Sequence, residues 1–221
     1  MSNLLRLNAC QLIACATTLL CVEAAWANDK DLDAQALGKG DWLLRGSVIS
    51  IRSLTQSSDI PAIGGRVKSQ DMRTLSLDIS YFVSDHWAFE FQGGRIERDY
   101  SVANSTFGNF SVGKIDTYAV TLALQYHFKP SELIMPYVGL GINYSWAGNV
   151  KPAENIPDFD VKPIASALIA VGVDVPFALH WVANASARYI SSPTYNFDGD
   201  GFQASVRINT LILGAGIGFY F

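Results

Sequence analysis

The stretch from Thr117 to Phe128 reads TYAVTLALQYHF, and its pattern decides the fold class. Every second side chain, beginning at Tyr118, is large and apolar, whereas the side chains between them are small or polar. Such an alternation with period two is typical of a β-strand with one apolar face. Residues 74–83 follow the same rule, so the chain contains at least two strands that are apolar on one side only.

The same alternation continues along the rest of the chain. Further strands are expected at roughly 42–51, 87–96, 134–146, 164–175, 181–190 and 206–221. This makes eight strands, each close to the length of about 9–11 residues that a membrane β-strand needs. Their connections alternate between short turns and long polar segments, the latter at 52–73, 97–113, 147–163 and 191–205. The sequence therefore predicts an all-β fold, an eight-stranded antiparallel transmembrane barrel, with short turns at the periplasmic end.

Composition supports a membrane protein that does not cross with helices. The 221 residues are 49% hydrophobic but only 16% charged, whereas soluble domains carry about 25% charged residues. Beyond residue 27 no stretch approaches the 18 consecutive apolar residues of a spanning helix. The net charge of −4 argues against a nucleic-acid partner, because such binders are normally basic.

The first 27 residues have the features of an export signal. Arg6 supplies a positive charge, residues 7–22 are mostly apolar, and Ala25-Trp26-Ala27 is a small-x-small cleavage site. A true N-terminal helix and a lipoprotein cleavage box at Leu12–Cys15 are the alternatives. We expect a cleaved signal peptide at 1–27, a periplasmic tail at 28–40 and the barrel at 41–221. All three cysteines lie in the signal segment, so the mature chain would have no disulfides or cysteine ligands.

The apolar face is expected to point outward, into lipid. The polar face carries many glycines and serines, which suit the narrow interior of a small barrel. Aromatic residues gather at the strand ends, where they would form interfacial girdles. The chain ends with Gly216, Phe219 and Phe221, which resemble the C-terminal signal read by the outer-membrane insertion machinery. An even number of strands places both termini in the periplasm of a Gram-negative bacterium.

Three short motifs resemble those of a known family. They are Pro136 to Tyr144 (PYVGLGINY), Leu44-Arg45-Gly46 and Val171-Gly172-Val173-Asp174, together with the aromatic C-terminus. With them the sequence resembles the OmpW family of small outer-membrane proteins, which includes the AlkL-type alkane importers. The resemblance implies a narrow, partly apolar channel that admits small hydrophobic molecules. Lateral exit through the barrel wall has been proposed for this family.

Strand direction and parity assign a depth to each inward side chain. An apolar upper lumen is expected from Ile49, Ile51, Ile96, Ile164, Leu168, Ile190, Ile208 and Ile212. A polar floor, from the middle of the barrel towards its periplasmic end, is expected from Arg45, Asp78, Glu90, Gln125, Asp174 and Arg188. Buried charges need partners, so the two arginines are expected to pair with the carboxylates. A ligand captured above such a floor would have to leave sideways.

The sequence therefore predicts passive passage of small hydrophobic molecules, with outer-membrane lipids, such ligands and the insertion machinery as partners. A closed structural or adhesion barrel that acts through its extracellular loops is the alternative. The three histidines fall at or near the periplasmic end, so a nucleophile at the external face would have no base. We expect neither an enzyme nor a metal or other cofactor.

Overall fold

The computed structural model describes residues 37–59, 66–69, 71–106, 108–128, 134–154, 161–193, 195–199 and 202–221. They lie in one compact unit that comprises residues 34–221. The predicted signal peptide at 1–27 and most of the predicted tail at 28–40 lie outside the described residues. None of the described residues form a helix that could cross a membrane.

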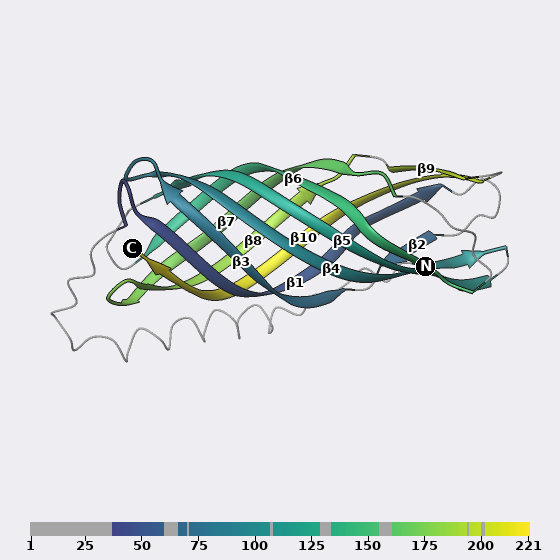
Figure 1. Cartoon of the computed structure of the whole chain (residues 1–221), viewed down its shortest axis with the longest axis horizontal. Helices are drawn as coiled ribbons and strands as arrows, with labels where there is room; N and C mark the ends of the chain where they lie inside the picture. Colours follow the sequence, from purple (N-terminus) through teal and green to yellow (C-terminus); the bar gives the residue numbers. More distant parts are fainter. Residues whose placement is uncertain are drawn as a thin grey trace, which may run out of the picture. The chain divides into compact units, whose positions relative to one another are not determined.

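Eight antiparallel strands form a closed barrel, as the alternation predicts (Figure 1). They are β1 (Trp42–Asp59), β3 (Met72–Phe82), β4 (Trp87–Ser105), β5 (Gly108–His127), β6 (Met135–Pro152), β7 (Ile164–Ala178), β8 (Trp181–Ser191) and β10 (Phe202–Tyr220). Each strand pairs with the next in this order, and β1 pairs with β10 to close the sheet. Closure leaves no sheet edge running the length of the barrel, which hydrocarbon would penalise.

The register fixes how steeply the strands tilt. One path of paired residues circles the barrel through Leu43, Ser80, Glu90, Ala123, Gly141, Leu168, Ile190, Thr210 and Ser53. The path starts on β1 at Leu43 and returns to β1 ten residues further along, at Ser53. Such a stagger requires strands tilted by about 40° to the barrel axis.

Several strands run further than the alternation indicates. Residues 97–113 are expected to be a polar loop, but β4 and β5 remain paired as far as Ser105 and Gly108. Two short strands, β2 (Arg66–Ser69) and β9 (Tyr195–Gly199), extend the sheet at the same end (Figure 1). A strand outside the membrane can be polar on both faces and still satisfy its backbone by pairing, so its alternation disappears while its hydrogen bonds remain.

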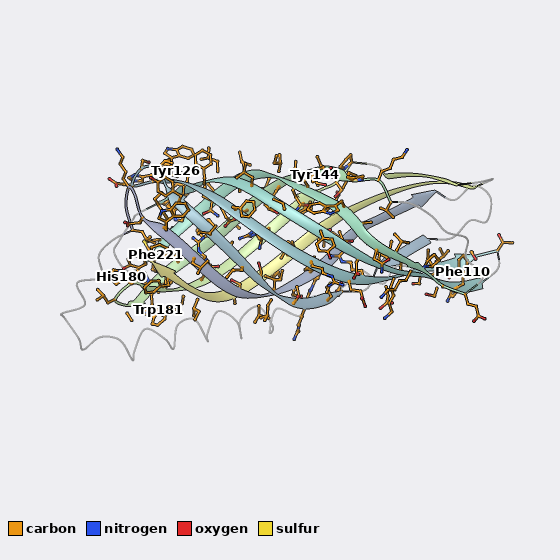
Figure 2. The ribbon with its side chains drawn as sticks, viewed as in Figure 1. Phe110, Tyr126, Tyr144, His180, Trp181 and Phe221 are labelled. Carbon is orange, nitrogen blue, oxygen red and sulfur yellow. The ribbon has the colours of Figure 1, made fainter. Side chains whose placement is uncertain are left out.

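Aromatic side chains mark the two borders of the lipid-facing band (Figure 2). At the short-turn end, Trp87 and Tyr126 lie with their ring centroids 5.0 Å apart, as do Trp181 and Phe219. Towards the other end, the rings of Tyr118 and Trp146 stack at 5.9 Å. The outward side chains between the two borders are exposed and apolar, which fits contact with lipid tails. They include Leu44, Val48, Leu75, Leu77, Phe89, Phe91, Leu122, Leu140, Ile142, Ile169 and Ile217.

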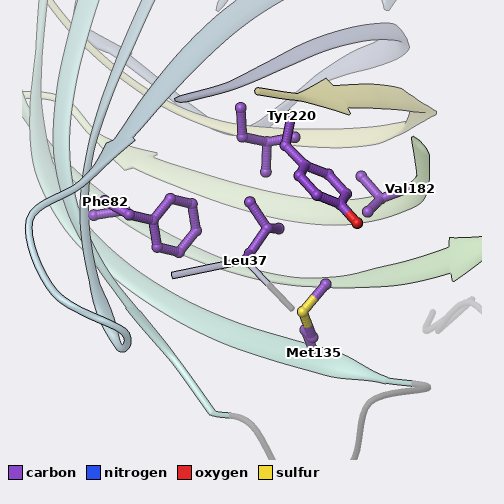
Figure 3. Close-up of a cluster of buried hydrophobic side chains, with 7 residues drawn as sticks. Leu37, Phe82, Met135, Val182 and Tyr220 are labelled. Atoms are coloured by element: carbon purple, nitrogen blue, oxygen red, sulfur yellow. The ribbon is translucent and has the colours of Figure 1, made fainter. Parts of the chain in front are cut away.

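An apolar plug fills the interior at the short-turn end (Figure 3). Its members are all at most 4% exposed: Leu37, Leu43, Phe82, Ala88, Met135, Val182 and Tyr220. Leu37 belongs to the segment expected to be a periplasmic tail, yet it is only 1% exposed. The backbone that follows it is fixed because the Gly40 amide donates to the Phe82 carbonyl at 2.8 Å.

Shortening Leu37 is expected to loosen this plug. Leu37→Ala should lower the free energy of unfolding by about 2–4 kcal/mol, because it removes buried methyl groups and leaves a cavity. Urea unfolding in lipid vesicles, followed by tryptophan fluorescence, would measure the change. Lys39→Ala, which truncates an exposed side chain two residues away, should stay within about 0.5 kcal/mol of wild type. Equal stability of the two variants would exclude a plugging role for Leu37.

Candidate functional site: the barrel lumen

Arg45 on β1 lies at the centre of a polar layer that crosses the barrel interior. Its side chain is 1% exposed, and Nε and Nη2 donate to the two oxygens of Asp174 at 3.1 and 2.7 Å. Nη1 donates to Asp78 at 3.3 Å. The two-pronged contact with Asp174 matches the planar fork of a guanidinium to a carboxylate. Strands β1, β3 and β7 are thereby joined through the lumen, and not only around the wall.

A second arginine completes this layer from β8. Arg188 donates from Nη2 to Glu90 Oε2 at 3.0 Å and from Nη1 to Gln92 at 2.6 Å. Glu90 Oε2 also accepts a hydrogen bond of 2.6 Å from the Gln125 amide. The six side chains expected at the floor are thus brought together and are each at most 5% exposed. Three carboxylates face two guanidiniums, so the layer carries one more negative than positive group.

Tyr137 and Ser80 join the layer, although no role in the floor is expected for them from the sequence. Asn184, which parity places among the inward polar residues, joins it too. Asn184 donates to Asp174 at 2.8 Å, and the Arg45 guanidinium lies 5.2 Å from the centre of the Tyr137 ring. A Cβ at Gly172 would lie 2.4 Å from the Tyr137 ring, so this glycine makes room for the tyrosine. Tyr137 and Ser80 are on the inward parity of their strands, which is the signal that could have found them.

The polar layer is the middle of the interior and not its lower end. The expectation that the lumen becomes polar towards the periplasm holds only as far as this layer, because the apolar plug lies below it. His127 links the two: its ring lies 4.8 Å from Phe82 of the plug and 4.9 Å from Tyr137 of the layer. Parity alone missed the plug, since the inward residues Phe82 and Tyr220 share their parity with small or polar residues such as Ser80 and Gly218.

Most of the eight side chains expected in the upper lumen can be placed. Ile51 and Leu168 are 1% and 2% exposed. The partly exposed ones are Ile49, Ile96, Ile164, Ile190 and Ile212, and the side chain of Ile208 lies outside the described residues. Ile51 is paired with Ile212, and Leu168 is paired with Ile190. Seven of the eight residues therefore lie on β7, β8, β10 and β1, whereas Ile96 lies on β4.

The opposite side of the upper lumen is polar. Asn143 on β6 donates to Thr121 on β5 at 2.9 Å, and Gln92 on β4 donates to Ser76 on β3. The upper lumen is therefore mainly apolar on β7, β8, β10 and β1 and mainly polar on β3 to β6, with Ile96 on β4 and the buried Ser166 on β7 as exceptions. This differs from the uniformly apolar upper lumen expected from the sequence, because parity assigns a face but not a position around the barrel.

The wall itself is interrupted between β3 and β4. Their pairing ends where Leu77 is paired with Gly93, and on this side β4 is next paired where Tyr100 meets Ser69 of β2. On its other side β4 stays paired with β5 throughout. Between these two pairings with β3 and β2, Met72–Ser76 of β3 and Gly94–Asp99 of β4 have no pairing with each other. We call this stretch the unpaired seam. A Cβ at Gly93 or Gly94, at the lower end of the seam, would meet no atom within 4 Å.

Two residues of the expected insertion signal, Gly216 and Phe219, lie on the last strand, and Phe221 directly follows it. Gly216 packs closely against β1, where a Cβ would lie 2.1 Å from the Gly46 carbonyl oxygen. The rings of Phe219 and Phe221 stack at 6.1 Å, and Phe221 is 61% exposed at the short-turn end (Figure 2). Their recognition by the insertion machinery stays a prediction. Among the described residues, no group of three acidic or histidine side chains is arranged as a metal site.

Comparison with known proteins gives a consistent result. Residues 38–221 match the OmpW family. The outer membrane protein AlkL of Ectopseudomonas oleovorans is 28% identical over 209 residues, which cover 89% of this chain and 87% of AlkL. The dibenzothiophene metabolism operon protein PahQ of Pseudomonas aeruginosa is 27% identical over 165 residues, 72% of this chain and 76% of PahQ.

Solved structures agree with the fold. The crystal structure of the outer membrane protein OprG from Pseudomonas aeruginosa matches with a TM-score of 0.75 at 20% identity, covering 86% of this chain and 99% of OprG. The family match spans most of the chain, and the closed barrel presents an apolar band bordered by aromatic girdles. The chain is thus a bacterial outer-membrane β-barrel, and it belongs to the OmpW family.

Proposed function

We propose that the barrel gives small hydrophobic molecules passive passage into the outer membrane, from the exterior through the upper lumen and out through the unpaired seam. The observation that carries this proposal is the combination of a blocked lumen with an interrupted wall above the block. Arg45 and Arg188 tie five strands together across the interior, and the plug around Leu37 lies beneath them. A straight path to the periplasm would have to break both layers.

The energetics favour capture above the polar layer. An apolar molecule gains about 2.5 kcal/mol for each 100 Å² of its surface that it buries against apolar side chains. Ile49, Ile190 and Ile212 are partly exposed on the inward face and offer such surface. The polar layer offers none, because its charges are already hydrogen-bonded and would lose partners to make room. A hydrophobic ligand is therefore held in the upper lumen.

The unpaired seam offers an exit because opening it breaks no backbone ladder bonds between β3 and β4. Elsewhere the wall is held by backbone ladders, whereas Gly94–Asp99, about 20 Å of strand, lack a partner on β3. Side chains such as Gln92 and Ser76 join the two strands at its lower end. Opening one side-chain hydrogen bond costs much less than breaking several ladder bonds, and no unsatisfied backbone pair is newly exposed to lipid. The exposed Leu75 would then guide an apolar molecule into the bilayer.

Bridging the seam should stop this passage. Cysteines at Ser76 and Gly94, joined by a short thiol-specific cross-linker, should lower uptake about fivefold when the protein is expressed in a Gram-negative host. Uptake would be followed with N-phenyl-1-naphthylamine, an apolar dye that fluoresces in lipid. Cleaving a reducible linker should restore uptake in the same cells. The other cysteines lie in the predicted signal peptide, so the bridge would be the only thiol adduct expected.

The matched control places the same linker where the wall is already closed. Ile79 and Phe91 are paired on the same two strands, so bridging Ile79→Cys to Phe91→Cys should leave dye uptake unchanged. If both bridges left uptake unaffected, lateral exit would be wrong. If the barrel gave no more uptake than an empty vector, the alternative of a closed structural or adhesion barrel would replace the proposal.

A further inference from the structure

The outer aromatic girdle is incomplete, and arginines take its place on three adjacent strands. On β5 and β6 the outward positions at this border are Tyr118 and Trp146, which face each other across one rung. On its other side Tyr118 is paired with Arg95 of β4. On β1 and β3 the outward positions near the same height are Arg52 and Arg73. The girdle therefore changes from aromatic to cationic across the seam side of the barrel.

The height of these arginines follows from the strand geometry. Trp42 and Arg52 are ten residues apart on the outward face of β1, with Trp42 in the inner girdle. Ten residues of a strand tilted by about 40° rise by about 25 Å, which is the height of the apolar band of such barrels. Arg52 thus stands at the border between the lipid tails and the head groups of the outer leaflet.

Arg52 and Arg73 are close neighbours on the lipid face. Arg73 is paired with Ser50, and Arg52 follows two residues later on the same side of β1. Such diagonal cross-strand positions are about 7–8 Å apart. Both residues are exposed, and within the described part of the chain neither has an ion-pair partner within 4.0 Å, although Asp71 is nearby at the start of β3.

Arg95 adds a third guanidinium across the seam. Its side chain is 59% exposed, it donates to Asp116 at 3.0 Å, and it lies 5.9 Å from the centre of the Tyr118 ring. The neighbouring acids on β4, Glu97 and Asp99, lie 3.8 and 3.6 Å from Lys114. Among the described residues, Lys114 is therefore shared by Glu97 and Asp99, and the exposed Asp71 has no ion pair within 4.0 Å. With only Asp71 next to them, Arg52 and Arg73 keep positive charge that an external anion can bind.

From this we infer that Arg52, Arg73 and Arg95 form a binding site for the phosphorylated glycolipid of the outer leaflet, with the phosphates on the guanidiniums and the acyl chains on the apolar band below. A guanidinium binds phosphate through two parallel hydrogen bonds, which gives such a site more strength than a single lysine would. The exposed Val48 and Leu75 lie directly towards the membrane centre from these arginines and would contact the acyl chains. The inference concerns the outer wall and does not rest on the proposed passage, although Arg73 and Arg95 lie on the two sides of the unpaired seam.

The test measures how much lipid A remains bound to the purified protein. Wild-type barrel in detergent micelles would be titrated with diphosphorylated lipid A and with its dephosphorylated form, and bound lipid would be counted by native mass spectrometry. We expect the phosphorylated lipid to bind at least tenfold more tightly, with an affinity that falls as salt is raised. Equal binding of the two forms would overturn the inference, because acyl contacts alone would then explain it.

Substitutions of the arginines test whether they form the lipid A site. Arg52→Gln/Arg73→Gln should weaken binding of phosphorylated lipid A about tenfold, whereas Arg52→Lys/Arg73→Lys should keep part of it. The matched control, Lys151→Gln/Lys162→Gln, removes two positive charges from elsewhere at the same end and should bind like wild type. If the control loses as much affinity as the arginine variant, only overall charge matters and the site does not exist. Competition by inorganic phosphate at equal concentration would also overturn it, since the site would then read a free anion.

Discussion

Arg45→Met is expected to destabilise the barrel by about 3–5 kcal/mol, the loss typical of breaking a buried ion pair from one side. Arg45 reaches Asp174, Asp78 and, at 3.8 Å, Glu90. Without it, three buried carboxylates share the single guanidinium of Arg188. The free energy of unfolding would be measured by urea titration in lipid vesicles with tryptophan fluorescence as the signal.

Two further variants separate charge balance from packing. Lys151→Met removes an exposed cation with no described ion pair and should change stability by less than about 0.5 kcal/mol. Arg45→Met/Asp174→Leu removes the pair together and should recover much of the loss, because an apolar pair of similar volume avoids the unpaired charge. If the double variant were as unstable as the sum of its single variants, the network would not act through charge pairing.

Charging the apolar half of the upper lumen is expected to lower dye uptake about tenfold or more. Ile49→Asp/Ile212→Asp would place two carboxylates where an apolar ligand gains its binding energy, and a loss of about 1.4 kcal/mol already corresponds to a factor of ten. A Cβ added at Gly214, next to Ile212 on β10, would lie 3.3 Å from Ile49, so the two isoleucines line the same part of the lumen. N-phenyl-1-naphthylamine uptake would be compared at equal surface expression.

One control keeps the two positions apolar, and the other adds a carboxylate to the polar half of the lumen. Ile49→Val/Ile212→Val preserves apolar surface and should retain at least half of the uptake. Thr121→Asp charges the polar half and should have a smaller effect than the double change on β1 and β10. Heat-modifiable migration on gels would verify that each variant forms a barrel. Undiminished uptake by the folded Ile49→Asp/Ile212→Asp protein would mean that these isoleucines only fill the core.

The strand count and the facing of each strand follow directly from the alternation, because lipid and lumen impose opposite chemistry on successive side chains. Thr117–Phe128 illustrates this, since its apolar residues are exposed and its small and polar residues are inward. The ends of the strands do not follow from it. Beyond the membrane both faces of β4 and β5 meet water, so the alternation is lost although pairing continues to Ser105.

The charged layer could be foreseen in its members and in its height at the middle of the barrel, but the plug beneath it could not. Parity selects Arg45, Asp78 and Glu90 as inward, and the high cost of an unpaired buried charge requires that they meet. The plug was not foreseen, because Leu37 belongs to a polar segment and only the fold carries it to Phe82 and Tyr220. The division of the upper lumen into apolar and polar halves was missed for a similar reason: it depends on which strands are neighbours around the barrel.

The sequence by itself determined that this chain is an eight-stranded outer-membrane barrel with buried arginines and carboxylates inside it. Local alternation encodes these features, because each side chain reports only whether it faces lipid or lumen. Only the tertiary structure decided where the wall is interrupted and which arginines share one height on its outer surface. The position of the interruption and the height of the arginines both depend on the strand register, which shifts by ten residues on one turn around the barrel. Register is a relation between distant strands that no single stretch of sequence contains.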